Sequence, residues 1–242
     1  MPIVVTIHGS RSLHLKGPSK AIYSWLLRRA NIVHGFGENY RVAFNVPNGK
    51  WRRLPNDVFV PGFIVPKDGA PVFSFVGAVG DRKGVDLLVE AWRIAHQQFP
   101  NARLIVAGPD ASHGVLPKRI EALPDATYIG AISNSEALLL MESAHTLVQP
   151  SRAEAFPVAV CEALGRGCAV VGTDVGAMGE LLREANQIVV RPEAQSIADG
   201  LVRSLDHKLG VDGYRFASAN LSTAIVSQRW ARLYTDAIGN RT

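Results

Sequence analysis

The sequence predicts an α/β protein in which a doubly wound parallel sheet follows a shorter α/β segment. From Pro71 onward, short runs rich in β-branched residues alternate with helical patterns, which is the order of a sheet built from βαβ units. The stretch Pro47–Pro71 is rich in Pro and Gly and predicts an interdomain linker. The residues before it suffice for two strands and a helix, so we expect a Rossmann-like segment that is shorter than a full domain.

Each element is predicted from its own pattern. In the first segment we expect strands over Pro2–Ile7 and Ala30–Phe36, with a helix over Ala21–Ala30. Apolar runs after the linker predict six strands: Val72–Val76, Arg103–Gly108, Ala126–Gly130, Thr146–Pro150, Ala169–Thr173 and Gln187–Arg191. One helix is predicted from the helical spacing of Leu88, Ala91, Trp92, Ala95 and Phe99. Further helices are predicted over Lys118–Leu123, after the capping box of Ser133 and Glu136, and between Pro157 and Gly167.

Composition excludes several classes of protein. An apolar content of 47% supports a packed core. No long apolar run or basic leader precedes the fold, so we expect a cytoplasmic protein without a membrane span. Cys161 and Cys168 are seven residues apart, a spacing that fits no zinc or redox motif, and we predict no metal site.

Positive charge is concentrated in the N-terminal quarter. Residues 1–60 hold nine Lys or Arg against two acidic residues, whereas the remaining 17 basic and 19 acidic residues nearly balance. This excess fits a solvated face, or contact with anionic acceptors, nucleotide diphosphates or an acidic membrane surface. Aromatic and basic residues do not interleave, so nucleic acid is not expected as a partner.

Two glutamates flank the predicted start of one helix. EAFPVAVCE places Glu154 in the loop after a strand and Glu162 in the second helical turn. Carboxylates accept hydrogen bonds from paired sugar hydroxyls, and a helix N-terminus attracts phosphate. Glutamates at this spacing are also common on solvated helices, so spacing leaves both interpretations open. An unpaired charge among the apolar neighbours of Glu162 is costly, which favours a functional role.

A glycine-rich loop joins the first strand after the linker to its helix. It is written VGAVGDRKG, where Gly77, Gly80 and Gly84 permit close backbone approach and Arg82 with Lys83 could neutralise a diphosphate. The spacing differs from the G-x-G-x-x-G dinucleotide pattern, which argues against NAD. A glycine turn carrying surface bases is the competing interpretation.

Together these motifs resemble the retaining GT-B glycosyltransferases of family four, also called glycosyl transferases group 1. The resemblance rests on PSRAEAFPVAVCEALGRGCAVVGTDVGAMGE over Pro150–Glu180, on GAVGDRKGVDLLVEA, and on the shorter matches VPNG, TIHG and WARLY. It implies a GT-B fold with a complete C-terminal Rossmann-like domain over 61–220 and a truncated acceptor-side segment with linker over 1–60. The helix in 221–242 is expected to pack back toward that segment.

The resemblance also implies roles for individual residues. Lys83, Arg82 and Gly77 would bind the donor diphosphate, and Glu162 the nucleotide ribose. Ala155, Phe156 and Pro157 would form the rest of the donor loop. Glu154 would bind hydroxyls of the transferred sugar and act in catalysis, with His8 near the reacting sugar; a lone histidine after a strand also fits a structural role. The donor would be a UDP- or GDP-linked sugar, used without a cofactor or metal.

Departures from the family pattern leave the activity of the isolated chain open. Ala78 stands where the family has Arg, and Ala155 where it has Gly, so weaker donor binding is expected. The first prediction is a glycosyltransferase that retains configuration and acts on a glycan, lipid or small-molecule acceptor. The alternatives are an incomplete donor-binding module, a split subunit completed by an N-terminal polypeptide, and a GT-B relative with other chemistry. Peripheral membrane contact through the basic segment is a further expectation.

Overall fold

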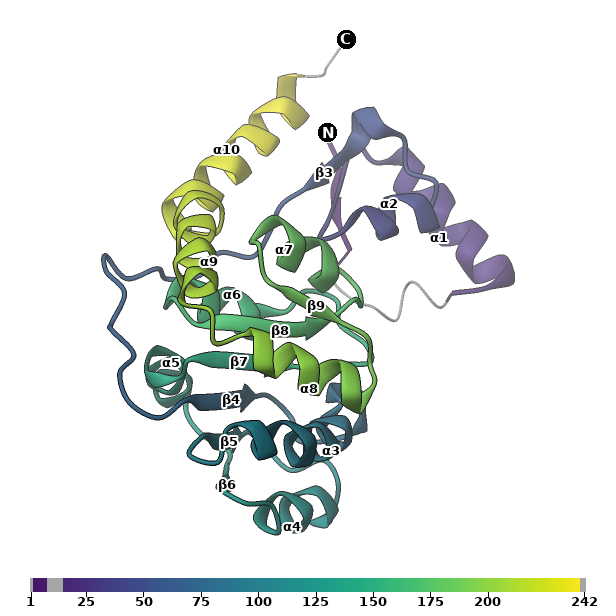
Figure 1. The fold of residues 1–242 in the computed structure, drawn as a ribbon. Helices are drawn as coiled ribbons and strands as arrows, with labels where there is room; N and C mark the ends of the chain where they lie inside the picture. Colours follow the sequence, from purple (N-terminus) through teal and green to yellow (C-terminus); the bar gives the residue numbers. More distant parts are fainter. Residues whose placement is uncertain (1, 8–14, 240–242) are drawn as a thin grey trace.

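The computed structural model describes residues 2–7 and 15–239, which form two parallel sheets joined by an extended segment (Figure 1). The expected α/β architecture is confirmed. In the described ranges, no helix combines the length and apolar character that a membrane crossing requires.

The larger sheet has six parallel strands in the order β6-β5-β4-β7-β8-β9. Chain order therefore runs outward in both directions from the central pair β4 and β7, which creates a topological switch point between them. Both faces are covered, so the central strands β4, β7 and β8 are mostly apolar and buried. The strands are β4 (Val72–Val76), β5 (Arg103–Ala107), β6 (Ala126–Gly130), β7 (Thr146–Gln149), β8 (Ala169–Thr173) and β9 (Ile188–Val190).

Helices cover the two faces of this sheet in separate layers. One buried cluster joins the sheet to α3 (Val85–Ala95), α4 (Val115–Glu121) and α8 (Ala194–Arg203). A second joins it to α5 (Asn134–Ser143), α6 (Val158–Gly165), α7 (Met178–Glu184) and α9 (His207–Asn220). Short 3-10 helices occur at η2 (Asn48–Lys50), η3 (Asp81–Lys83) and η4 (His96–Gln98).

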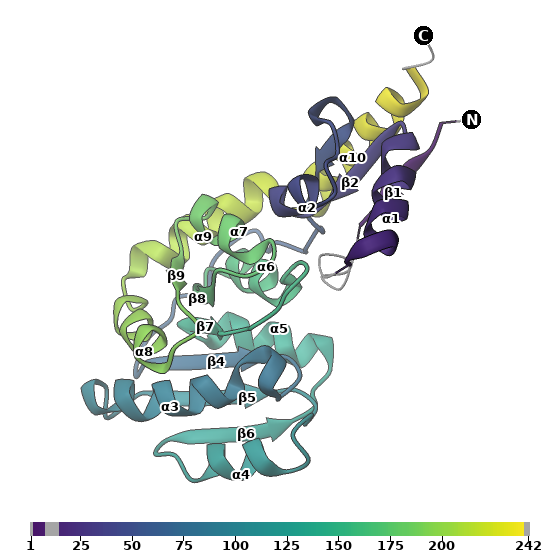
Figure 2. The same ribbon diagram turned by 90° about the vertical axis from the view of Figure 1, so that its right-hand side faces the viewer.

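The smaller sheet has three parallel strands in the order β1-β2-β3. They are β1 (Val4–Thr6), β2 (Ile32–Gly35) and β3 (Trp51–Arg53). Helices α1 (Gly17–Arg29) and α2 (Glu38–Ala43) contribute to the buried cluster that includes Leu27, Val33 and Tyr40. The last helix, α10 (Thr223–Gly239), packs Leu233 and Ala237 against Ile32 and Leu54, so the end of the chain returns to the first sheet (Figure 2).

The linker and two predicted helices differ from the structure; α4 begins at Val115 rather than Lys118, and α2, α7, α8 and α9 were not predicted. The interpretation of the whole stretch Pro47–Pro71 as linker was wrong, because its residues Trp51–Arg53 form β3 and pair with β2 through Val33 and Trp51. Three residues between turns carry no alternating pattern, so no sequence signal marks this strand. The first helix begins at Gly17 rather than Ala21, since Pro18 sits in its first turn, where proline is tolerated.

Candidate functional site

The candidate site lies at the switch point, where the loops that follow β4 and β7 meet. Strands β4 and β7 pair directly, so both loops leave the same edge of the sheet side by side. Gly84 ends the first loop with φ +70, and a Cβ there would lie 1.9 Å from the Pro150 carbonyl oxygen. Only glycine permits this contact. The two loops are therefore in direct backbone contact.

Lys83 and Glu154 meet across these loops, although they are 71 residues apart in sequence. The Lys83 ammonium donates a hydrogen bond to the Glu154 carboxylate and forms an ion pair with it. Glu154 is 7% exposed. It also accepts hydrogen bonds from Ser151 Oγ at 3.1 Å and Gln149 Nε2 at 3.4 Å. The structure thus brings together a predicted donor-binding lysine and the predicted catalytic glutamate.

Arginine contacts fix the relative position of the two loops. Arg82 donates from its guanidinium to the Ala153 carbonyl at 3.2 Å, and its own carbonyl accepts from the Arg152 N–H at 2.9 Å. Arg152 forms a bidentate pair with Asp86, with both N–O distances 2.6 Å. Hydrogen bonds from Arg152 lower the pKa of Asp86. Arg82 was predicted as a site residue, whereas no sequence pattern indicated the Arg152–Asp86 clamp.

Glycines let two further loops approach this pair. A Cβ on Gly108 would lie 1.9 Å from the Gly77 carbonyl oxygen, so the exit of β5 runs directly against the glycine-rich loop. A Cβ on Gly176, which has φ +58, would lie 1.8 Å from the Glu154 carbonyl oxygen. The loop before α7 therefore packs on the backbone of Glu154, and these close approaches leave no room for side chains.

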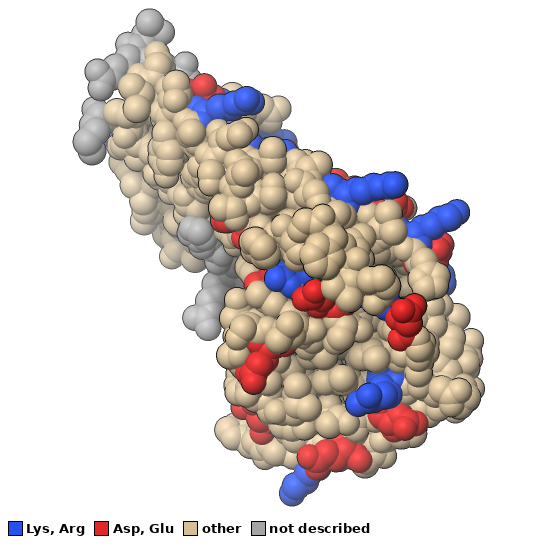
Figure 3. Space-filling view, turned by 90° about the vertical axis from the view of Figure 1, so that its left-hand side faces the viewer, with Lys and Arg blue, Asp and Glu red and all other residues tan. Residues whose placement is uncertain are grey.

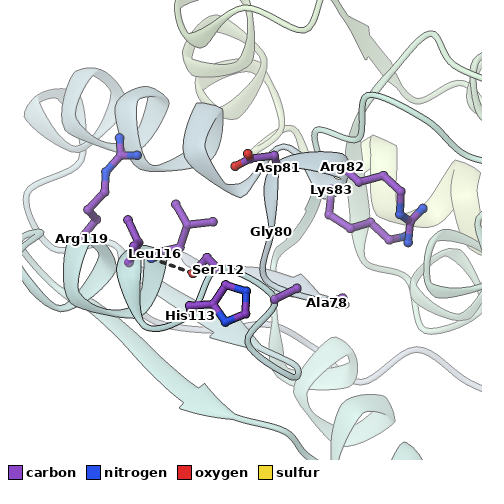
Figure 4. A pocket seen from close by; sticks show the side chains of 11 residues that line it. Ala78, Gly80, Asp81, Arg82, Lys83, Ser112, His113, Leu116 and Arg119 are labelled. Carbon is purple, nitrogen blue, oxygen red and sulfur yellow. Dashed lines mark hydrogen bonds between the residues drawn. The ribbon is translucent and has the colours of Figure 1, made fainter.

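A cavity of about 540 Å³ opens beside the glycine-rich loop (Figure 4). On one side it is lined by residues 78 and 80–83. On the other side lie Ser112 and His113, in the loop before α4, and Arg119, in the last turn of that helix. Figure 4 shows Arg82 and Lys83 extending side by side, away from Arg119. Lys83 thus lines the cavity and also contacts Glu154. Sequence reasoning missed Ser112, His113 and Arg119, because no motif marks them.

Glu162 is not brought into contact with the Lys83–Glu154 pair. It lies half-buried in the second turn of α6, and the charged group that acts on it is Arg166, one turn further along the helix. Burial raises the pKa of Glu162, and Arg166 opposes that effect. The position of Glu162 in the second turn of α6 agrees with the sequence-based expectation.

The remaining residues of the predicted donor loop, Ala155, Phe156 and Pro157, lie between Glu154 and the start of α6. Ala155 follows Glu154, and the Pro157 carbonyl accepts from the Val160 and Cys161 N–H groups in the first turn of α6. The ring of Phe156 packs against Phe36 from the first segment, with centroids 4.8 Å apart. Phe156 therefore joins the two parts of the chain. His8 lies outside the described residues.

The carboxyl edge of the smaller sheet contacts the start of α7 in the larger unit through charged side chains. Arg53 pairs with Glu180 at 3.0 Å and with Glu184 at 2.5 Å. The Glu38 N–H, at the start of α2, donates to Glu180 at 3.2 Å. Within the described ranges, no cluster of three or more His, Cys, Asp or Glu is placed to hold a metal ion. The candidate site is therefore a cationic cavity within the larger α/β unit and, beside it, the buried carboxylate of Glu154.

Comparison with known proteins gives consistent matches. The family model described as glycosyl transferases group 1 matches residues 70–207. A phosphatidylinositol N-acetylglucosaminyltransferase subunit of Arabidopsis thaliana is 27% identical over 187 residues, covering 74% of this chain and 41% of that protein. Phosphatidyl-myo-inositol mannosyltransferase of Mycobacterium tuberculosis is 24% identical over 270 residues, covering 99% of this chain and 68% of that protein.

Solved structures give the same picture at the level of the fold. The Anabaena protein HepE, in complex with UDP, superposes with a TM-score of 0.83 at 17% identity, covering 97% of this chain and 72% of that one. This likeness supports a GT-B-type arrangement of the two parallel sheets.

Proposed function

This chain belongs to the glycosyl transferases group 1 family, and from that premise we propose that it transfers a sugar from a nucleotide-sugar donor with retention of anomeric configuration. The observation that carries the proposal is the Lys83–Glu154 contact at the switch point, beside a cationic cavity. The retained configuration is inferred from the motif that holds Glu154 and Glu162.

In the proposed reaction, Lys83 and Arg82 bind the donor diphosphate and stabilise the charge that develops as it leaves. Glu154 accepts hydrogen bonds from hydroxyls of the transferred sugar, and Glu162 from the nucleotide ribose. The acceptor hydroxyl attacks the anomeric carbon on the face that the phosphate leaves. Its proton passes to the leaving phosphate oxygen, which keeps charge and atoms in balance. Lys83 and Arg82 supply the positive charge, so the proposal includes no metal ion.

The matched proteins support particular classes of donor and acceptor. The HepE structure contains UDP, which supports a UDP-linked donor, and a GDP-linked donor is the other candidate. Both sequence relatives are named for reactions on phosphatidylinositol lipids. A lipid-linked acceptor is therefore the first candidate, ahead of a soluble glycan.

Helix α1 supports a location at the membrane surface. Its outward residues Ile22, Trp25 and Leu26 are 61%, 47% and 51% exposed. The Arg29 guanidinium lies 4.0 Å from the Trp25 ring centroid. The helix sequence GPSKAIYSWLLRR contains three basic residues and no acidic one. Apolar, aromatic and basic side chains on one helix are typical of contact with an anionic lipid surface.

The opposite side of the molecule differs from α1 in character. There Lys and Arg alternate with Asp and Glu over the face shown in Figure 3. We therefore assign the membrane contact to α1 and propose that the protein works in the cytoplasm, peripherally at an anionic membrane.

Isothermal titration with UDP- and GDP-linked sugars tests the proposed function. We expect at least one donor to bind the wild-type chain, and Lys83→Met to weaken binding of that donor by tenfold or more, since a charge-assisted contact contributes roughly 1.5–3 kcal/mol. Lys118→Met, on the exposed side of α4, is the matched control and should bind normally. A folded wild-type chain that binds none of these donors would refute the proposal.

A second candidate is a donor-binding protein that needs another polypeptide for turnover. Ala78 provides no cation where the family carries Arg, and the Arabidopsis relative is itself named as a subunit. This chain spans 41% of the length of that relative. Donor hydrolysis or sugar transfer by the isolated chain would contradict this candidate. Activity that appears only when a partner polypeptide is added would support it.

A further inference from the structure

Tyr40 carries a buried hydroxyl that has no hydrogen-bond partner among the described residues. The residue lies on α2, is 0% exposed, and its ring packs in the core of the first segment with Val33, Phe44 and Trp51. A buried hydroxyl of this kind is costly, because it leaves water without gaining a replacement hydrogen bond. The ring alone does not account for the hydroxyl, since phenylalanine would fill the same space.

The position of α2 relates this hydroxyl to Glu154. Helix α2 begins where the Glu38 N–H meets Glu180, and a Cβ on Gly37 would lie 3.3 Å from the Ala177 Cα. The same 176–180 loop packs on the Glu154 backbone through Gly176. The helix that carries Tyr40 therefore contacts the same loop that packs on the backbone of Glu154.

Electrostatics agree with this placement. Burial raises the pKa of the Tyr40 phenol, and the negative charge of Glu154 raises it further. Tyr40 is therefore a neutral O–H donor at physiological pH. Tyr23, the half-buried tyrosine of α1, has a pKa raised by burial alone.

The contacts of Glu154 change when a donor occupies the site as proposed above. Lys83 now donates to the carboxylate, but a bound diphosphate competes for the same ammonium. A carboxylate that loses Lys83 keeps Ser151 and Gln149 as donors. Besides the sugar hydroxyls, it then has acceptor capacity for a further protein donor that holds its orientation toward the sugar.

We propose that Tyr40 is a positioning residue for Glu154, whose phenol O–H donates a hydrogen bond to the carboxylate once bound donor has drawn Lys83 away. The inference rests on the proposed function. It assigns the acceptor-side segment a part in orienting the sugar-binding carboxylate, so that donor binding and the packing of the two α/β units are coupled through one hydroxyl.

The test compares Tyr40→Phe with the control Tyr23→Phe, whose ring also packs against Phe44, with centroids 4.9 Å apart. Donor binding is measured by titration with UDP- and GDP-linked sugars, and turnover by release of the nucleoside diphosphate. Thermal unfolding reports on the fold. We expect Tyr40→Phe to lower kcat by roughly tenfold or more, the loss typical of a hydrogen bond to a charged group, with a donor Kd within about threefold of wild type.

The melting temperature separates this role from a structural one. The hydroxyl has no partner in the described part of the donor-free chain. The melting temperature of Tyr40→Phe should therefore equal that of the wild type or exceed it by up to about 2–4 °C. Tyr23→Phe should leave kcat unchanged. An unchanged kcat in Tyr40→Phe, or a lower melting temperature, overturns the assignment. A wild-type chain that binds no donor instead refutes the proposed function, and the role of Tyr40 with it.

Discussion

Removing either partner of the Lys83–Glu154 contact should destabilise the protein by different amounts. Glu154 is 7% exposed in the wild-type structure, and in Lys83→Met its carboxylate would keep Ser151 and Gln149 as donors. Loss of one partner from a buried ion pair costs about 3–5 kcal/mol. Because two hydrogen bonds still stabilise the charge, we expect the free energy of unfolding to fall by about 2–3 kcal/mol.

The reverse substitution leaves the cation rather than the carboxylate without its partner. Lys83 also lines the cavity of about 540 Å³, so in Glu154→Gln its flexible side chain can turn toward water. We expect a loss of about 1 kcal/mol. The double variant should lose less than the sum of the two single variants, with a coupling energy of about 1–3 kcal/mol.

Urea unfolding of the four proteins at neutral pH measures this cycle. Lys118→Met serves as the control, because its side chain is exposed and its substitution should change stability by less than about 0.5 kcal/mol. Equal and additive losses from the two single variants would show that Lys83 and Glu154 are not energetically coupled, and would refute the ion pair as a stabilising contact of the site.

Three further outcomes are expected. Gly84→Ala should destabilise by about 2 kcal/mol or more, because its Cβ would meet the Pro150 carbonyl; Gly69→Ala, with φ +88 and no atom within 4 Å, controls for backbone strain alone, and equal melting temperatures for the two would contradict the contact. The raised pKa of Glu162 means that folding favours the protonated form of this side chain. The stability that the protonated form contributes is therefore fully present below the pKa of the unfolded chain, and it is lost as pH rises through the pKa of the folded protein. Glu162→Gln should therefore be more stable than wild type at neutral pH and equal to it at low pH, and melting curves across that range would expose the opposite trend. Trp25→Asp should lose flotation with phosphatidylglycerol-containing vesicles by tenfold or more, whereas Leu139→Asp, at an exposed leucine of α5, should float like wild type; equal flotation of both variants would exclude α1 as the lipid contact.

The sequence predicted the meeting of Lys83 with Glu154 in part. Each residue follows a predicted parallel strand, so both belong to the same edge of one sheet. What placed them in contact is the direct pairing of β4 with β7, and strand order depends on packing between distant segments. The motifs identified the two loops, whereas the order of the strands in the sheet determined that the loops are in contact.

Other features depended on contacts that no local pattern encodes. Strand β3 is three residues long and is defined by its register with β2. The pair of Arg152 with Asp86 forms only after the chain is packed, and so does the buried environment in which the Tyr40 hydroxyl lacks a partner among the described residues. Local patterns therefore predicted the elements and the principal charged residues, whereas the groups that orient them became visible only in three dimensions.

The Lys83–Glu154 contact has a consequence for donor selection in the proposed reaction. A diphosphate that binds Lys83 must first separate Lys83 from Glu154. The free energy of this ion pair therefore reduces the free energy of diphosphate binding, and each 1.4 kcal/mol lowers the affinity about tenfold. A nucleotide alone leaves the buried carboxylate without this donor. A nucleotide sugar supplies hydroxyls that hydrogen-bond to it and recover part of the loss. The contact therefore favours the intact donor over the free nucleoside diphosphate, and it assists release of the nucleotide after the sugar has been transferred.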